Sequence, residues 1–171
     1  MSERTGLVTL KGNPITLVGD ELKAGDKAPD FQLTGTDMSS KSLSDYEGKV
    51  KLVVVVPSLD TSVCDTEVRK FNEHATSLGD DIIVLTVSMD LPPAQKRWCG
   101  AAGVDRVECL SDYKDHSFGK AWGLRIKEIG FLARSIFVLD KDNTVRYMEL
   151  VPEIGQEPDY DAALAAAKQL V

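Results

Sequence analysis

The sequence has no long hydrophobic run, and this absence excludes the integral membrane proteins. Its apolar stretches fall well short of the roughly 18 residues that a membrane-spanning helix requires. The first residues also lack the basic start and apolar core of a secretory signal, so we expect a cytoplasmic protein. The formal net charge of -7 disfavours nucleic acid and anionic membranes as partners, because both would repel the chain.

Cysteine and histidine are scarce, at three and two residues respectively. An odd number of cysteines without a secretory signal argues against a structural disulfide framework, and the absence of a Cys-x-x-Cys pair argues against a thioredoxin-type dithiol carrier. Cys64, Cys99 and Cys109 do not combine with His74 or His116 at the spacing of structural zinc sites. We therefore expect no metal and no cofactor, and the cysteines are either reactive thiols or buried bystanders.

The length of 171 residues fits a single domain with one substantial core. Two short alternating runs at residues 7–10 and 15–18, separated by Lys-Gly-Asn-Pro, predict a hairpin within an N-terminal extension at residues 1–20. Residues 52–56 form a continuous β-branched and leucine run, which is the pattern of a central strand covered on both faces. Pro57 ends this strand because it lacks the N–H that a ladder needs.

The rest of the chain alternates between strand and helix patterns. Apolar spacing predicts a helix at residues 64–78 and a parallel strand at 82–87, which together with the first strand form a βαβ unit. A short helix at residues 94–102 is expected to turn Ala94, Trp98 and Ala101 inward. Later elements are expected at residues 107–110 (strand), 135–139 and 144–150 (hairpin), and after Asp159 (capped helix). This order predicts a thioredoxin-like α/β fold with a central mixed sheet flanked by helices.

Cys64 lies at the predicted helix start, one turn after the N-cap candidates Asp60, Thr61 and Ser62. The unpaired N–H groups and the positive end of the helix dipole there favour a thiolate. Thr61, three residues before the cysteine, is able to place its hydroxyl beside the sulfur. The alternative is that Cys64 is a buried cysteine acting as a small hydrophobe.

The pattern Pro57-x-x-x-Thr61-x-x-Cys64 resembles the peroxiredoxin signature, and PSLDTSVCDTEVRKFN is similar to the thiol peroxidase subfamily. Further similarity lies in GDKAPDFQL, SMDLPPAQKRWCGAAG, LARSIFVLD and EPDYDAAL, so the resemblance covers nearly the whole chain. It implies a thioredoxin fold, a homodimer, and reduction of hydrogen peroxide and organic hydroperoxides with electrons from thioredoxin or a similar dithiol.

The resemblance also implies the site residues. Cys64 corresponds to the peroxidatic cysteine, Thr61 to the hydroxyl that orients the peroxide, and Pro57 to the proline that shields the pocket. Arg134 corresponds to the arginine that pairs with the thiolate, and Cys99 to the resolving cysteine. The implied intermediates are a Cys64 sulfenic acid and an intramolecular Cys64–Cys99 disulfide.

Three alternatives remain open from the sequence. The same disulfide switch serves equally well in a peroxide sensor or redox-regulatory binding protein. Cys109 or an external thiol is an alternative resolver, although its neighbours Val107 and Leu110 favour a core position for Cys109. In the third alternative, all three cysteines are purely structural.

Overall fold

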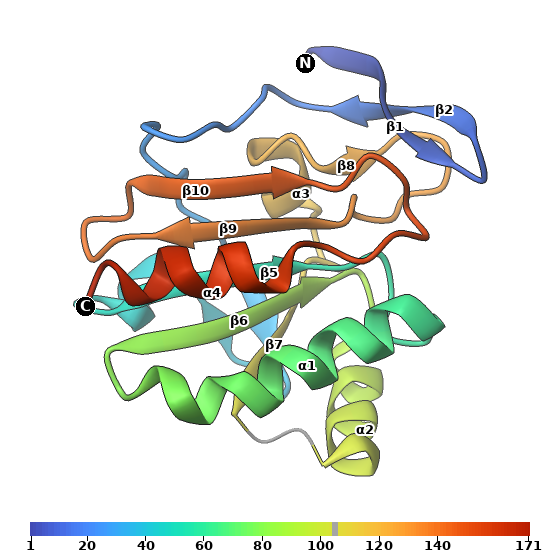
Figure 1. The fold of residues 1–171 in the computed structure, drawn as a ribbon. Coiled ribbons are helices and arrows are strands. Elements are labelled where there is room, and N and C mark those ends of the chain that lie inside the picture. The colour runs from blue at the N-terminus through green and yellow to red at the C-terminus, as the bar shows by residue number, and fades with distance from the viewer. Residues whose placement is uncertain (104–105) are drawn as a thin grey trace.

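Two β-sheets and the helices packed on them make up the fold (Figure 1). The computed structural model describes residues 1–103 and 106–171. The strands are β1 (Glu3–Leu10), β2 (Asn13–Val18), β3 (Leu33–Gly35), β4 (Ser40–Lys41), β5 (Val50–Val55), β6 (Ile82–Ser88), β7 (Val107–Ser111), β8 (Arg125–Ile126), β9 (Ser135–Leu139) and β10 (Val145–Leu150). The helices are α1 (Ser62–Leu78), α2 (Pro92–Ala102), α3 (Ser117–Ala121) and α4 (Tyr160–Lys168), with a 3-10 helix at Leu43–Tyr46.

The larger sheet has the strand order β10-β9-β5-β6-β7-β3-β4. Its centre is the predicted βαβ unit, in which β5 pairs parallel with β6. β7 extends the parallel region by pairing with β6, and β9 pairs antiparallel with the other side of β5. Every residue of β5 is buried, as expected for its apolar run and unexpectedly also for Lys51, whose amine donates to the Asn143 side chain at 2.6 Å. The central mixed sheet and the thioredoxin-like order of elements are therefore confirmed.

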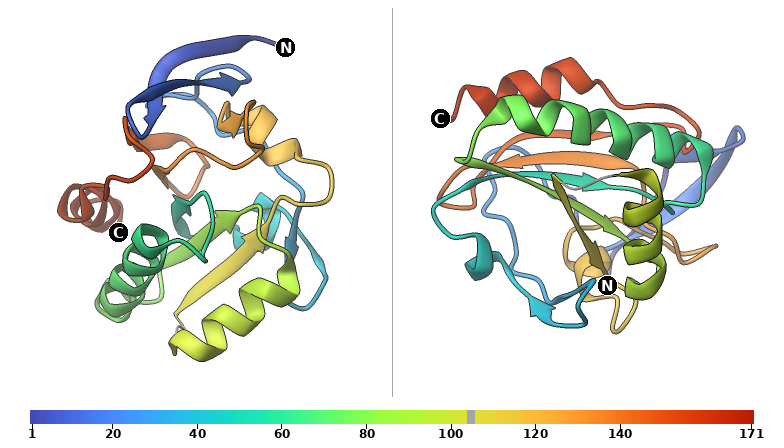
Figure 2. Two further views of the ribbon diagram at one scale, coloured as in Figure 1. Left: turned by 90° about the vertical axis from the view of Figure 1, so that its right-hand side faces the viewer. Right: turned by 90° about the horizontal axis from the view of Figure 1, so that it is seen from below.

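Each face of this sheet carries its own apolar core. Helices α1 and α4 lie side by side over one face, and α2 lies beyond them against β7 (Figure 2). The predicted stripe of α1 points into this first core, which contains Cys64, Val68, Phe71, Ala75 and Leu78. Helix α3 supplies Phe118 to the core on the opposite face, where the Trp122 that follows the helix also packs.

The predicted N-terminal hairpin is present as β1 and β2, and it continues into a small sheet of order β1-β2-β8. Thr9 joins this sheet to the end of β10, since its N–H donates to the Pro152 carbonyl at 2.8 Å and its carbonyl accepts from the Ile154 N–H at 3.0 Å. Among the described residues, no helix combines the length and apolar character needed to cross a membrane.

The inward face of α2 differs from the predicted one. Gln95 is fully buried and Ala101 is exposed, although the apolar pattern had placed Ala94, Trp98 and Ala101 inward. The Gln95 side-chain amide donates to the Leu110 carbonyl of β7 at 2.8 Å, so a polar contact fixes the rotation of this short helix. Trp98 remains partly buried, and Cys99 beside it also packs on the core.

Candidate active site

Cys64 occupies the first turn of α1, at the end of the central strand. β5 is followed by the buried Pro57, and α1 begins at Ser62 with Thr61 as its N-cap residue. The Cys64 side chain has no exposed surface. The N–H groups of a first helical turn have no partner within the helix, so the sulfur lies at the positive end of α1.

Arg134 and Glu67 form a buried ion pair beside this sulfur. Arg134 directly precedes β9, and its Nη1 lies 2.5 Å from Glu67 Oε2 while its Nε donates to the Ile154 carbonyl at 3.0 Å. The two side chains are 1% and 0% exposed. Glu67 is one turn after Cys64, which brings the pair and the sulfur to the same side of α1.

The electrostatics of this group tie Arg134 to the cysteine. Burial works against the charge of Arg134, but the neighbouring Glu67, which is hydrogen-bonded to it, and the nearby Cys64 raise its pKa overall. Burial raises the pKa of Glu67 to about 7, against the opposing effect of Arg134. A guanidinium held here is able to stabilise negative charge on sulfur and on an oxygen bonded to it.

The loop before α1 is fixed by Asp90, which follows β6. Its carboxylate accepts hydrogen bonds from the Ser58 hydroxyl at 2.7 Å, the Leu59 N–H at 2.8 Å and the Ser88 hydroxyl at 2.7 Å. The two bonds from Ser58 and Leu59 hold the segment after Pro57, and the bond from Ser88 ties the same carboxylate to the end of β6. Asp90 therefore positions the start of α1, and with it Cys64.

Thr61 has the backbone conformation of an N-cap residue, but its side chain does not cap the helix. Its hydroxyl donates to the Ser58 carbonyl at 2.9 Å. The lone pairs of that oxygen remain available as acceptors. The contact of this hydroxyl with a peroxide stays a prediction.

The structure places Cys99 beside Cys109, and the two Sγ atoms are 3.0 Å apart. Cys109, in β7, is 3% exposed, which confirms the predicted core position. All three cysteines are free thiols in the structure, and the Cys64–Cys99 disulfide implied by the resemblance stays a prediction. Cys99 has to leave Cys109 if it is to reach Cys64.

Helix α2 is docked on α1 close to Cys64. The Trp98 Nε1–H donates to Asp65 at 2.9 Å, and Arg69 binds both Asp65, at 2.9 Å, and the Ala102 carbonyl at the end of α2, at 3.2 Å. Asp65 is the residue after Cys64. A movement of the first turn of α1 is thereby linked to the helix that carries Cys99.

Glu67 and Asp90 were missed by the sequence-based reasoning. A glutamate adjacent to Val68 of the apolar stripe, one turn after a candidate nucleophile, was the available signal for Glu67. Its significance depends on Arg134, which is distant in sequence.

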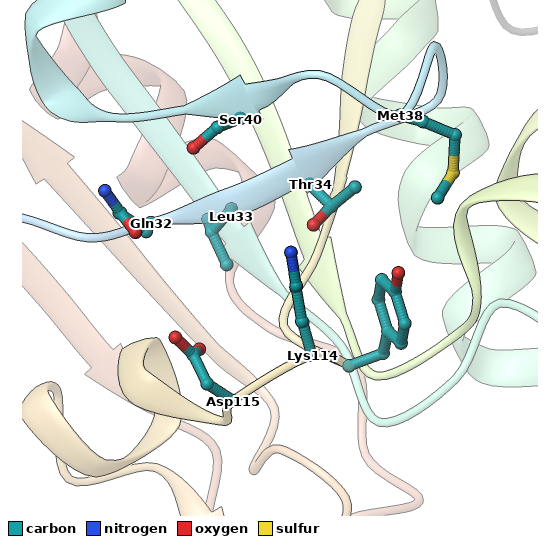
Figure 3. A pocket seen from close by; sticks show the side chains of 8 residues that line it. Gln32, Leu33, Thr34, Met38, Ser40, Lys114 and Asp115 are labelled. Carbon is teal, nitrogen blue, oxygen red and sulfur yellow. The ribbon is translucent and has the colours of Figure 1, made fainter.

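A separate cavity of about 130 Å³ lies between β3, β4 and the segment after β7 (Figure 3). In the figure, the Lys114 side chain points toward β3. Its lining consists of Gln32, Leu33, Thr34, Met38, Ser40, Tyr113, Lys114 and Asp115. None of these is a cysteine or a residue of the Cys64 site, so this cavity does not serve the thiol chemistry.

A thiol at a helix start, beside a buried arginine and on a thioredoxin-like sheet, defines a thiol-based redox protein. The chain matches the redoxin family model over residues 23–164. It is 57% identical to a thiol peroxidase of Streptococcus pneumoniae, covering 96% of this chain and 100% of that protein. It is 54% identical to a thiol peroxidase of Bacillus subtilis, covering 96% and 98% of the two chains. The crystal structure of a peroxiredoxin-like protein from Aquifex aeolicus superposes with a TM-score of 0.91 at 44% identity, covering 98% of each chain.

The chain therefore belongs to the redoxin family. Within that family it groups with the thiol peroxidases, and it is an enzyme that reduces peroxides at the expense of thiols. The sensor alternative is not favoured by these relationships.

Proposed function

We propose that Cys64 is the thiol that attacks the substrate, and that both hydrogen peroxide and organic hydroperoxides are reduced. The Cys64 thiolate bonds to one peroxide oxygen, and the O–O bond breaks. The second oxygen departs with the bonding electron pair and takes up a proton, giving water or an alcohol. The sulfur is oxidised to a sulfenic acid.

The single observation that carries this assignment is the buried Arg134–Glu67 pair beside the Cys64 sulfur. Arg134 stabilises the attacking thiolate and the charge that develops on the departing oxygen, while Glu67 holds the guanidinium in place. In this proposal, Thr61 orients the peroxide with its hydroxyl and Pro57 shields the pocket from water.

Cys99 is proposed to resolve the sulfenic acid. Its thiolate bonds to Cys64 Sγ, and the sulfenic hydroxyl leaves as water after protonation. Because Cys64 is fully buried and Cys99 lies against Cys109, the first turn of α1 and the last turn of α2 must open. Gly100 lowers the helical stability of that part of α2, which ends at the left-handed cap residue Gly103. Thioredoxin or a similar dithiol then reduces the disulfide by exchange.

We propose further that the enzyme is a cytoplasmic homodimer that requires neither nucleic acid nor a membrane. The homodimer is proposed from the resemblance to peroxiredoxins. The cytoplasmic location is proposed from the odd number of cysteines, because an odd number argues against a framework of structural disulfides. Sedimentation of the purified protein at micromolar concentration tests the dimer. Fractionation of the source cells tests the location.

The catalytic assignment is tested by peroxide consumption coupled to thioredoxin and its reductase. Cys64→Ser and Cys99→Ser should both lose steady-state turnover. Cys109→Ser is the matched control. In the absence of reductant, it should still react with one equivalent of peroxide and form the Cys64–Cys99 disulfide. Undiminished turnover in Cys64→Ser would overturn the assignment, and slow turnover in the wild type would favour a sensor.

A further inference from the structure

Cys99 and Cys109 form a preassembled thiol pair that the proposed peroxidase cycle does not use. Their sulfurs are 3.0 Å apart, and a disulfide bond is about 2.05 Å long, so the two need to approach by only about 1 Å. Cys64 lies near Arg134 on the buried side of α1. It can bond to Cys99 only after α1 and α2 open. In the folded arrangement, the natural partner of Cys99 is Cys109.

The two thiols of this pair differ in acidity. A hydrogen bond from Cys109 lowers the pKa of Cys99, and the same bond together with burial raises the pKa of Cys109. Cys99 is therefore the more acidic thiol of the two and the more readily available nucleophile. Once Cys99 is tied in a disulfide, the hydrogen bond that retains the Cys109 proton is lost. Cys109 then becomes easier to ionise, and it meets the oxidised Cys99 when the last turn of α2 packs back against β7, where the two sulfurs lie 3.0 Å apart.

We propose that Cys109 is a second resolving cysteine, which moves the disulfide from Cys64–Cys99 to Cys99–Cys109; this inference rests on the proposed function. The Cys109 thiolate attacks Cys99 Sγ, the Cys64–Cys99 bond breaks, the Cys99–Cys109 bond forms, and Cys64 leaves as a thiolate. One disulfide is exchanged for another, so no further oxidant or reductant is consumed, and the Cys109 proton passes to solvent. Arg134 and the start of α1 stabilise the departing thiolate.

The transfer places the disulfide where one of its two sulfurs, that of the half-buried Cys99, is accessible. Cys99 and Cys109 line an open cavity of about 400 Å³, together with the exposed cationic residues Lys96 and Arg106. An external dithiol reaches Cys99 there without unfolding α1, whereas Cys64 has no exposed surface.

The exchange has a stoichiometric consequence. After the disulfide has moved, Cys64 is again a free thiolate and α1 is able to close over it. The enzyme is then ready for a second peroxide before any reductant arrives. Each chain should therefore consume two equivalents of peroxide in the absence of thiols, where a simple Cys64–Cys99 mechanism consumes one.

The test is a titration of the fully reduced protein with hydrogen peroxide, without reductant, followed by alkylation and peptide mapping. With one equivalent, the wild type should show a Cys99–Cys109 disulfide and an alkylated Cys64. With two equivalents, it should also show a sulfenic acid at Cys64, trapped by dimedone. Cys109→Ser should stop at one equivalent with a Cys64–Cys99 disulfide, and Cys109→Ala provides the same comparison with an apolar residue in the core.

The outcomes separate this inference from the proposed function. A wild type that consumes one equivalent and maps as Cys64–Cys99 would overturn the transfer and leave the peroxidase mechanism intact. No consumption in either the wild type or the Cys109 variants would overturn both.

Discussion

Replacing Glu67 with glutamine should make the stability of the protein less dependent on pH. Burial raises the pKa of Glu67 from 4.5 in the unfolded chain to about 7, despite the nearby Arg134. Between these two values the folded protein keeps a proton that the unfolded chain has released. The stability that Glu67 contributes is therefore fully present below pH 4.5 and is lost as the pH rises through 7.

The magnitude follows from the two pKa values. At about 1.36 kcal/mol per pKa unit, the loss across this window is about 3 kcal/mol. Glu67→Gln keeps the size of the side chain and an acceptor oxygen for Arg134, but it cannot ionise. The variant and the wild type should be about equally stable at pH 4.5, and the variant should be about 3 kcal/mol more stable at pH 8.

Urea unfolding of the reduced proteins between pH 4.5 and 8 measures this difference. Glu73→Gln is the matched control, because Glu73 lies on the same helix but is exposed. Its curve should run parallel to that of the wild type. A Glu67→Gln protein that is several kcal/mol less stable than the wild type at pH 8 would refute the reasoning, because it would show that the ionised Glu67–Arg134 pair is net stabilising.

Three further predictions concern the framework around Cys64. Arg134→Lys keeps a charge but loses the guanidinium that bridges Glu67 and the Ile154 carbonyl, so kcat/KM for peroxide should fall about 100-fold; a wild-type value in steady-state kinetics would contradict this. Asp90→Asn removes the charge from three hydrogen bonds and should lower the free energy of unfolding by about 1–2 kcal/mol in thermal melts, whereas the exposed Asp80→Asn should have no effect. Trp98 should report the opening of α2, so peroxide should change the tryptophan fluorescence of the wild type but not of Trp98→Phe, which retains Trp122.

The fold followed closely from local patterns in the sequence. Three local patterns predicted structure, and the structure confirms each of them. The apolar run at residues 52–56 predicted a central strand, Pro57 its end, and the 3.6-residue spacing from Cys64 to Leu78 the buried face of a helix. The Asp159 cap is confirmed as well, since its side chain accepts a hydrogen bond from the Ala162 N–H. These signals are local, so neighbouring residues suffice to reveal them.

The site was less accessible because its key contacts join distant segments. Glu67 looks like an ordinary helix residue until Arg134 is placed against it, 2.5 Å away. The rotation of α2 depends on the hydrogen bond from Gln95 to the Leu110 carbonyl. Hydrophobic periodicity does not predict this contact, because it considers only apolar residues. The contact between Cys99 and Cys109 requires the packing of α2 on β7, which the spacing of the two residues does not specify.

The central claim is that the Cys64 sulfur takes an oxygen atom from the peroxide. Locating the sulfenic acid tests this claim most directly. In a Cys99→Ser, Cys109→Ser double variant no resolving thiol remains, so one equivalent of hydrogen peroxide should leave a dimedone adduct on Cys64 in nearly every chain. The adduct is identified by peptide mass spectrometry. A double variant that reacts at the wild-type rate but carries no adduct or higher oxide at Cys64 would contradict the account.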